Sequence, residues 1–277
     1  MWIVNNRPKL EDALNDIKPL VKHCNALNNS HEEALKKLYM AYDQKGYATT
    51  EELEPLDNVK DVIKGQYSSK MTGNGILGYV RRGLNTNVTQ CPMCSINETH
   101  PLDHYMDKSN YGQLACCRLN LVPTCGICNR LKHDNPYTGF VHSYYDKYPD
   151  VNFLVTTFTI RNNYYGMEFS IDESVIGNPI LAAKTQNQFK HMNLKERLHK
   201  AGISFVNDMI GGLICTTNKE LQKQLLSLEN NYKERYGRND WRTSIIRGLR
   251  SNNAFNIDVV NSMRLPIKLS PVNGGGA

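Results

Sequence analysis

Two C-x2-C motifs, Cys91 with Cys94 and Cys125 with Cys128, limit the folds open to this chain more than any other pattern in it. Each motif can supply two of the four ligands of a tetrahedrally coordinated ion. Two such motifs joined by a loop are typical of structural zinc. The spacing suits a metal in a reducing compartment better than a disulfide framework, although the chain has eight cysteines. Four thiolates leave no open coordination position, so this zinc would stabilise the fold and would not activate water. Catalysis would need a second metal.

Length and composition indicate a folded protein. A chain of 277 residues is long enough for a sizeable core and for more than one lobe. Hydrophobic residues make up 40% and charged residues 22%, which is ordinary globular usage. The net charge of +6 suits an anionic partner without requiring one. No apolar run approaches the roughly 18 residues needed to cross a bilayer, so we expect no membrane association and a cytoplasmic location.

The N-terminal region is patterned as helices. Apolar residues recur every three or four positions over 10–27, which predicts an amphipathic helix that Pro19 would kink. A second helix is predicted to begin at Ser30, with Glu33 completing a capping box, and to stop at Gly46. After about residue 67 the pattern gives way to a polar loop that leads to the first cysteine motif.

Beyond the cysteine motifs the pattern changes twice. Residues 151–160 are rich in β-branched and aromatic side chains, and 166–171 resemble a partner strand, so a hairpin is expected. Helical patterning returns from about Asn193, with a further helix opened by Asn239 or Asp240. The predicted class is α+β, with a small zinc-stapled centre and a β-hairpin embedded between helical N- and C-terminal segments.

The expected division of the chain has five parts. They are a helical N-terminal segment (1–70), a metal-bearing domain (71–150), a β-hairpin (151–172), a helical C-terminal segment (173–272) and a flexible tail (273–277).

Polar residues stand in an informative order between and after the cysteine motifs. Asp103 and His104 come first, Asn120 follows, and Asn129 and Lys132 come directly after the second motif. Neutral imidazole has an unperturbed pKa near 6.5 and can act as a base around neutral pH. One carboxylate and one amide oxygen would suit a hard Mg²⁺ or Mn²⁺ ion and leave positions for phosphate and water.

This order resembles the zinc-bearing, four-cysteine branch of the HNH endonucleases, also called His-Me finger or ββα-metal nucleases. The resemblance covers roughly residues 91–133. It implies that His104 is the general base and that Asp103 and Asn129 are ligands of a catalytic Mg²⁺ or Mn²⁺. It also implies that Asn120 holds the loop and orients the histidine, and that Lys132 reaches the phosphate.

The chain departs from the commonest family pattern at two positions. Asn129 stands where many members have the last histidine, and an amide oxygen there favours Mg²⁺ over softer ions. Met106 stands where relatives often have proline, which affects only the shape of the turn.

The leading functional hypothesis is a metal-dependent endonuclease that acts on DNA. An HNH module between helical arms is similar to the nuclease components of bacterial antiphage systems, including Septu-like and retron-associated ones, in which a partner ATPase or sensor controls cutting. One alternative is a zinc-ribbon module that binds nucleic acid or protein without cleavage. Another is an HNH nuclease that cuts RNA.

An aromatic segment and a basic segment can each be interpreted in two ways. The aromatic residues between 137 and 148 would either pack over the zinc centre, which is favoured, or stack on unpaired bases. The basic surplus between 219 and 250 would form either a phosphate-tracking face or an ordinary solvated helix surface.

Overall fold

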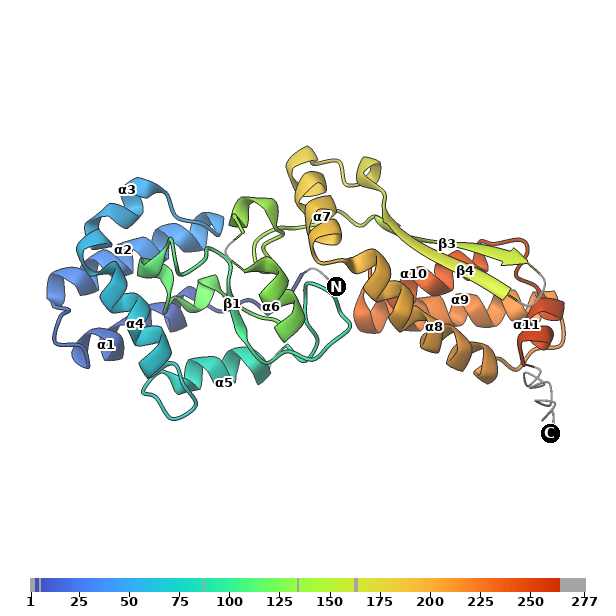
Figure 1. The fold of residues 1–277 in the computed structure, drawn as a ribbon, viewed down its shortest axis with the longest axis horizontal. Coiled ribbons are helices and arrows are strands. Elements are labelled where there is room, and N and C mark those ends of the chain that lie inside the picture. The colour runs from blue at the N-terminus through green and yellow to red at the C-terminus, as the bar shows by residue number, and fades with distance from the viewer. Residues whose placement is uncertain (1–2, 5, 87, 134, 162–163, 265–277) are drawn as a thin grey trace, which may run out of the picture. The chain divides into compact units, whose positions relative to one another are not determined.

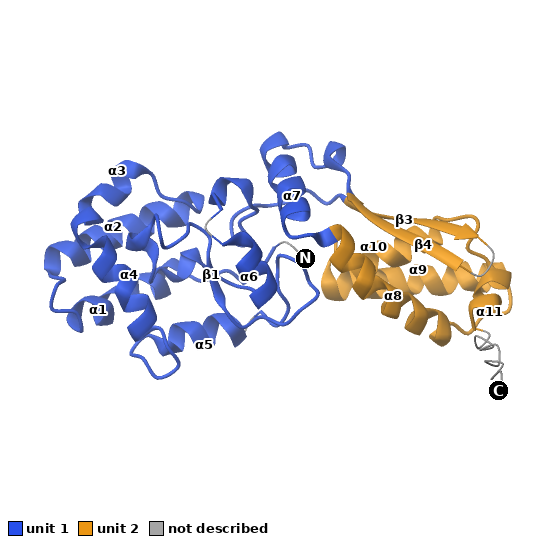
Figure 2. Ribbon diagram, viewed as in Figure 1, with its two compact units in different colours: residues 1–153, 171–194 blue, residues 154–170, 195–277 orange. Residues whose placement is uncertain are grey.

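The computed structural model describes residues 3–4, 6–86, 88–133, 135–161 and 164–264, and the expected tail at 273–277 lies outside these residues. The chain divides into two compact units (Figure 2). Unit 1 contains residues 1–153 and 171–194, and unit 2 contains 154–170 and 195–277. The class is α+β, because helices dominate and the described strands pair into two small antiparallel sheets. None of the described helices combines the length and the apolar character that crossing a membrane demands.

Unit 1 begins with two helices that pack on each other. α1 (Leu10–Lys22) includes Pro19 in its last turns, and α2 spans Asn29–Lys45. The capping box predicted at Ser30 and Glu33 is wrong, because the Asn28 side chain caps α2 and His31 completes the box. The predicted stop is confirmed, since Gly46 adopts the left-handed conformation with φ of 76°.

Short helices continue the lead-in to the cysteine motifs. They are α3 (Thr50–Leu53), the 3-10 turn η1 (Glu54–Val59), α4 (Lys60–Lys70) and α5 (Gly78–Thr86). The loop predicted after residue 67 is wrong over α5, which buries Val80 and Leu84 one turn apart. This pair is the apolar signal that the surrounding glycines and arginines obscured.

The central part of unit 1 is a strand, strand, helix arrangement (Figure 1). β1 (Leu102–His104) pairs antiparallel with β2 (Leu121–Pro123), so that Asp103 faces Val122 in the ladder. α6 (Gly126–Lys132) follows directly. Four 3-10 turns and one more helix complete the list for this unit: η2 (Gly112–Leu114), η3 (Arg118–Asn120), η4 (Tyr137–Gly139), η5 (Glu173–Val175) and α7 (Pro179–His191).

Unit 2 joins the hairpin to the C-terminal helices. The predicted hairpin is confirmed as β3 (Leu154–Arg161) and β4 (Tyr164–Ile171). The helices are α8 (Leu194–Gly212), α9 (Asn218–Tyr236), α10 (Trp241–Arg250) and α11 (Ile257–Arg264). Asp240 opens α10 by accepting a hydrogen bond from the backbone of Arg242, as one of the two predicted N-caps. Trp241 is buried and packs against Phe205 with ring centroids 5.5 Å apart.

Candidate functional site

The four motif cysteines form one buried cluster. Their sulfur atoms all lie within 4.8 Å of one another, and Cys94 Sγ is 3.9 Å from Cys125 Sγ. Zn–S bonds of about 2.3 Å place the sulfurs of a tetrahedral site about 3.8 Å apart. The cluster is therefore arranged to hold a metal ion and is compatible with structural zinc. Within the described residues, this is the one group of three or more histidine, cysteine or acidic side chains with metal-ligand spacing.

Backbone turns present these sulfurs. The Cys91 carbonyl accepts hydrogen bonds from the amides of Cys94 and Ser95, and Ser95 closes the turn with a φ of 53°. Cys125 caps α6, and its sulfur accepts a hydrogen bond from the Cys128 amide at 3.4 Å. Hydrogen bonds from Cys128 and the other thiols lower the pKa of Cys125 far below its ordinary value. Donors directed at sulfur favour the thiolate form that a metal needs.

A second site lies beside β1. Asp103, His104 and Asn129 line a pocket of about 340 Å³, so the structure brings these three predicted residues together. The rest of the lining is largely polar or charged: Tyr67, Arg81, Pro101, Leu102, Asp107, Lys108, Arg130 and His133.

His104 is held in one tautomer. Its Nε2 atom lies 3.0 Å from the carbonyl oxygen of Ala115, and because a carbonyl only accepts, Nε2 carries the hydrogen. Nδ1 is then the acceptor of the ring. Burial lowers the pKa of His104 to about 3 against the opposing hydrogen bond to Ala115, so the imidazole is neutral at neutral pH. The Tyr67 ring packs against it at a centroid distance of 4.5 Å.

Lys132 is placed differently from the expected phosphate-contacting position. Its side chain is fully buried, and its Nζ lies 3.0 Å from Asp103 Oδ2 and 2.7 Å from the His104 carbonyl oxygen. The physical reason is that a buried carboxylate needs a nearby positive charge. Burial raises the pKa of Asp103, and Lys132 opposes that rise. Lys132 therefore supports β1 from inside the unit.

Asn120 makes a buried hydrogen-bond network that holds the chain after β1. Its Oδ1 accepts from the Met106 amide at 2.8 Å and from the Tyr42 hydroxyl at 3.0 Å. Its Nδ2 donates to the Met106 carbonyl at 3.0 Å. The Tyr42 hydroxyl also lies 3.1 Å from His142 Nε2. The network therefore fixes the backbone after β1, and it includes Tyr42 and His142, which sequence analysis did not assign to the site.

Asp103 and Asn129 offer the oxygen donors that a hard divalent cation prefers. Asp103 Oδ2 is buried and accepts no hydrogen bond from the described residues, although it belongs to the ion pair with Lys132. Asn129 is half-buried on the same pocket wall. Two oxygen donors therefore line the same pocket, and the Asp103 carboxylate is already paired with Lys132.

Sequence reasoning missed several residues of this pocket. Tyr67 and Arg81 come from α4 and α5, outside the segment with the motifs, while Lys108 and Arg130 lie within it. The one sequence signal that could have pointed to Arg81 is the apolar pair that marks α5 as a helix.

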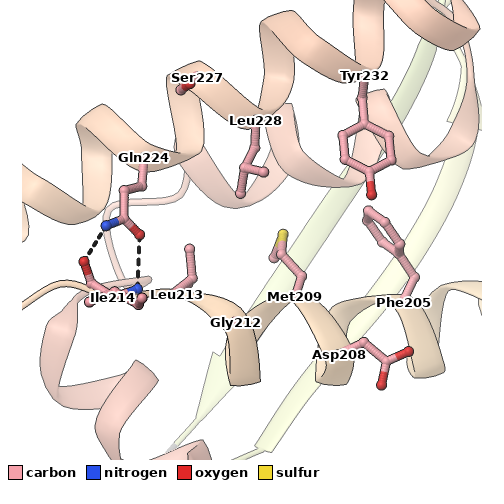
Figure 3. A pocket seen from close by; sticks show the side chains of 10 residues that line it. All are labelled: Phe205, Asp208, Met209, Gly212, Leu213, Ile214, Gln224, Ser227, Leu228 and Tyr232. Atoms are coloured by element: carbon pink, nitrogen blue, oxygen red, sulfur yellow. Dashed lines mark hydrogen bonds between the residues drawn. The ribbon is translucent and has the colours of Figure 1, made fainter.

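A larger pocket of about 590 Å³ lies within unit 2, between α8 and α9 (Figure 3). Its lining is mainly apolar, with the single carboxylate of Asp208 and with Phe205 and Tyr232 at one end (Figure 3). Among the described residues, the lining contains no histidine, cysteine or basic side chain, so the pocket beside β1 is the better candidate for chemistry.

Comparison of the chain with protein-family models, with curated proteins and with solved structures finds no match.

Proposed function

We propose that this protein is a metal-dependent HNH-type endonuclease that hydrolyses phosphodiester bonds in DNA, with His104 as the general base. The observation that carries the proposal is the Nε2 contact of His104 with the Ala115 carbonyl at 3.0 Å, in the same pocket as Asp103 and Asn129. A neutral imidazole whose Nε2 is held by a carbonyl can accept a proton at Nδ1, which has no hydrogen-bond partner among the described residues.

Each residue of the site would have its own role in the reaction. The Nδ1 atom of His104 takes a proton as the oxygen of a water attacks phosphorus, and the bond to the leaving oxygen breaks. The Ala115 carbonyl keeps the ring oriented and stabilises the imidazolium that forms. Asp103 and Asn129 would hold Mg²⁺ or Mn²⁺, which when bound supplies a Lewis acid at the phosphate. Solvent returns a proton to the leaving oxygen.

The four-cysteine cluster would hold Zn²⁺ in a purely structural role in this proposal. The second cysteine motif runs directly into α6, which carries Asn129 and Lys132. The cluster therefore sets where α6 begins and, with it, how those two side chains meet β1.

The test is cleavage of supercoiled plasmid DNA by the purified chain in Mg²⁺ or Mn²⁺, with His104→Ala as the inactive variant. General-base catalysis contributes about 10²–10⁴-fold, so the variant should lose cleavage to that extent. His133→Ala is the matched control, because it alters an exposed histidine on the same pocket. Equal activity of wild type and His104→Ala would reject the assignment.

The wider role we propose is an effector in cytoplasmic antiphage defence, regulated by a partner ATPase or sensor. It rests on the similarity of an HNH module between helical arms to such nucleases. Full activity of the isolated chain would contradict regulation by a partner. Cleavage of RNA in place of DNA would favour an HNH nuclease that cuts RNA. Metal-dependent binding without cleavage would favour a zinc-ribbon binding module.

A further inference from the structure

Tyr67 organises the positive charge of the pocket. Its ring centroid lies 4.5 Å from that of His104, 4.9 Å from Lys108 Nζ and 5.7 Å from Arg81 Cζ. The ring is almost fully buried in α4, and its hydroxyl donates to the Leu102 carbonyl at 3.4 Å. Two cations therefore gather on one aromatic ring that also touches the proposed base.

Arg81 is held in a fixed orientation with donors to spare. Its Nε donates to the Met71 carbonyl at 2.8 Å, and its Nη2 donates to the Tyr67 hydroxyl at 3.1 Å. A guanidinium has five N–H groups, so three remain, and none of these has a partner in the part of the chain that the structure describes. A planar fork that is already immobilised loses little entropy when it binds an oxyanion.

The two acids of the pocket both have polar partners within unit 1. Asp103 pairs with the buried Lys132, and Asp107 accepts hydrogen bonds from Ser109 and Asn110. Over the described residues, neither Lys108 nor Arg130 forms an ion pair. The pocket therefore presents positive charge from α5, from the loop after β1 and from α6.

We propose that Arg81, held on Tyr67, binds a backbone phosphate next to the bond that is cut, with Lys108 and Arg130 binding the neighbouring backbone. The inference rests on the proposed function for its ligand, a nucleic-acid strand. Phosphate oxygens accept hydrogen bonds and these cationic side chains only donate them, so the two groups are complementary. Contacts to phosphate do not read the base sequence. Helices α4 and α5 thus supply a substrate-binding part of the site from outside the segment that carries the motifs.

The experiment measures binding apart from cleavage. A fluorescein-labelled DNA duplex is titrated with the His104→Gln protein over a series of KCl concentrations and followed by anisotropy. His104→Gln retains a donor for the Ala115 carbonyl, so the packing of Tyr67 is kept. Adding Arg81→Gln should weaken binding about tenfold and reduce the slope of log K against log[salt] by about one.

Arg82→Gln is the matched control, because it makes the same charge change at the next position of α5. Arg82 is exposed, donates to the Gly73 carbonyl and does not line the pocket. Equal effects of Arg81→Gln and Arg82→Gln, or no binding of the duplex, would overturn the inference. The wild-type protein could bind the duplex through Arg81 and yet cleave no DNA in Mg²⁺ or in Mn²⁺. That result would uphold the phosphate site and reject the nuclease function.

Two further variants test the inference if Arg81→Gln fails to fold. Lys108→Gln and Arg130→Gln should each lower the salt slope by about one, because each removes one phosphate contact. Unchanged slopes in both variants would overturn the inference even if Arg81→Gln cannot be purified.

Discussion

Lys132 buries its whole side chain to bring Nζ within 3.0 Å of Asp103 Oδ2. The same ammonium donates to the His104 carbonyl at 2.7 Å, so a single cation on α6 holds the backbone and a carboxylate of β1. A buried ion pair of this kind adds little net stability, but removing one partner leaves the other uncompensated.

Lys132→Met should therefore lower the free energy of unfolding by about 3–5 kcal/mol, because Asp103 would remain buried without its partner. The loss should shrink at low pH, where Asp103 becomes protonated, and the Asp103→Asn/Lys132→Met pair should recover part of it. Urea unfolding measures each value. Arg130→Gln, on the exposed face of α6, is the control and should change stability by no more than about 0.5 kcal/mol. A loss below about 1 kcal/mol in Lys132→Met would contradict this account.

The cysteine cluster predicts one tightly bound zinc ion per chain, measured by elemental analysis of the purified protein. Cys125→Ser should lose this zinc and destabilise unit 1, because metal binding at such a site is coupled to folding. Cys24→Ser is the matched control, since Cys24 is half-buried outside the cluster. Retention of stoichiometric zinc in Cys125→Ser would count against the four-cysteine site.

The network around Asn120 predicts coupling between residues far apart in sequence. Tyr42→Phe removes the hydroxyl that donates to Asn120 Oδ1, and it should cost about 1–2 kcal/mol because His142 and Asn120 each lose a partner. Asn120→Ala removes several bonds at once and should cost more. A double-mutant cycle measures the coupling. Additive losses would show that the two side chains do not act together.

Acidification should destabilise the protein partly through His142. Burial lowers the pKa of His142 well below its ordinary 6.5, and the charges of Lys184, Lys132 and Arg7 add to that effect. The unfolded chain then binds a proton that the folded protein excludes, so the contribution of His142 is complete above pH 6.5 and declines as the pH falls below it.

The slope from one such proton is at most about 1.4 kcal/mol per pH unit. His142→Gln keeps a donor for Tyr42 but does not titrate, so its unfolding free energy should depend less steeply on pH between 6.5 and 5. Chemical unfolding at several pH values measures both proteins. Identical slopes would exclude His142 as a contributor.

Local features of the fold were the ones that sequence could predict. The hairpin, the N-cap at Asp240 and the stop at Gly46 each depend on residues within a few positions of one another. The predicted start of α2 was wrong because Asn28 and Ser30 are both residues that favour the N-cap, and it is Asn28 that forms the capping box, with His31. The segment of α5 was predicted as a loop because the two buried apolar residues of this helix are surrounded in sequence by glycine and polar residues.

The two C-x2-C motifs were enough to predict the four-cysteine cluster, because each motif is a local turn that presents two thiols to one metal ion. Asp103, His104, Asn120 and Asn129 could be named as candidates because they stand between or directly after these motifs. The burial of Lys132 against Asp103, and the approach of Tyr67 and Arg81 to the pocket from α4 and α5, became visible in the folded chain. The physical reason is that a charged side chain takes whichever partner the packing brings near it, and residues tens of positions away along the chain set that packing.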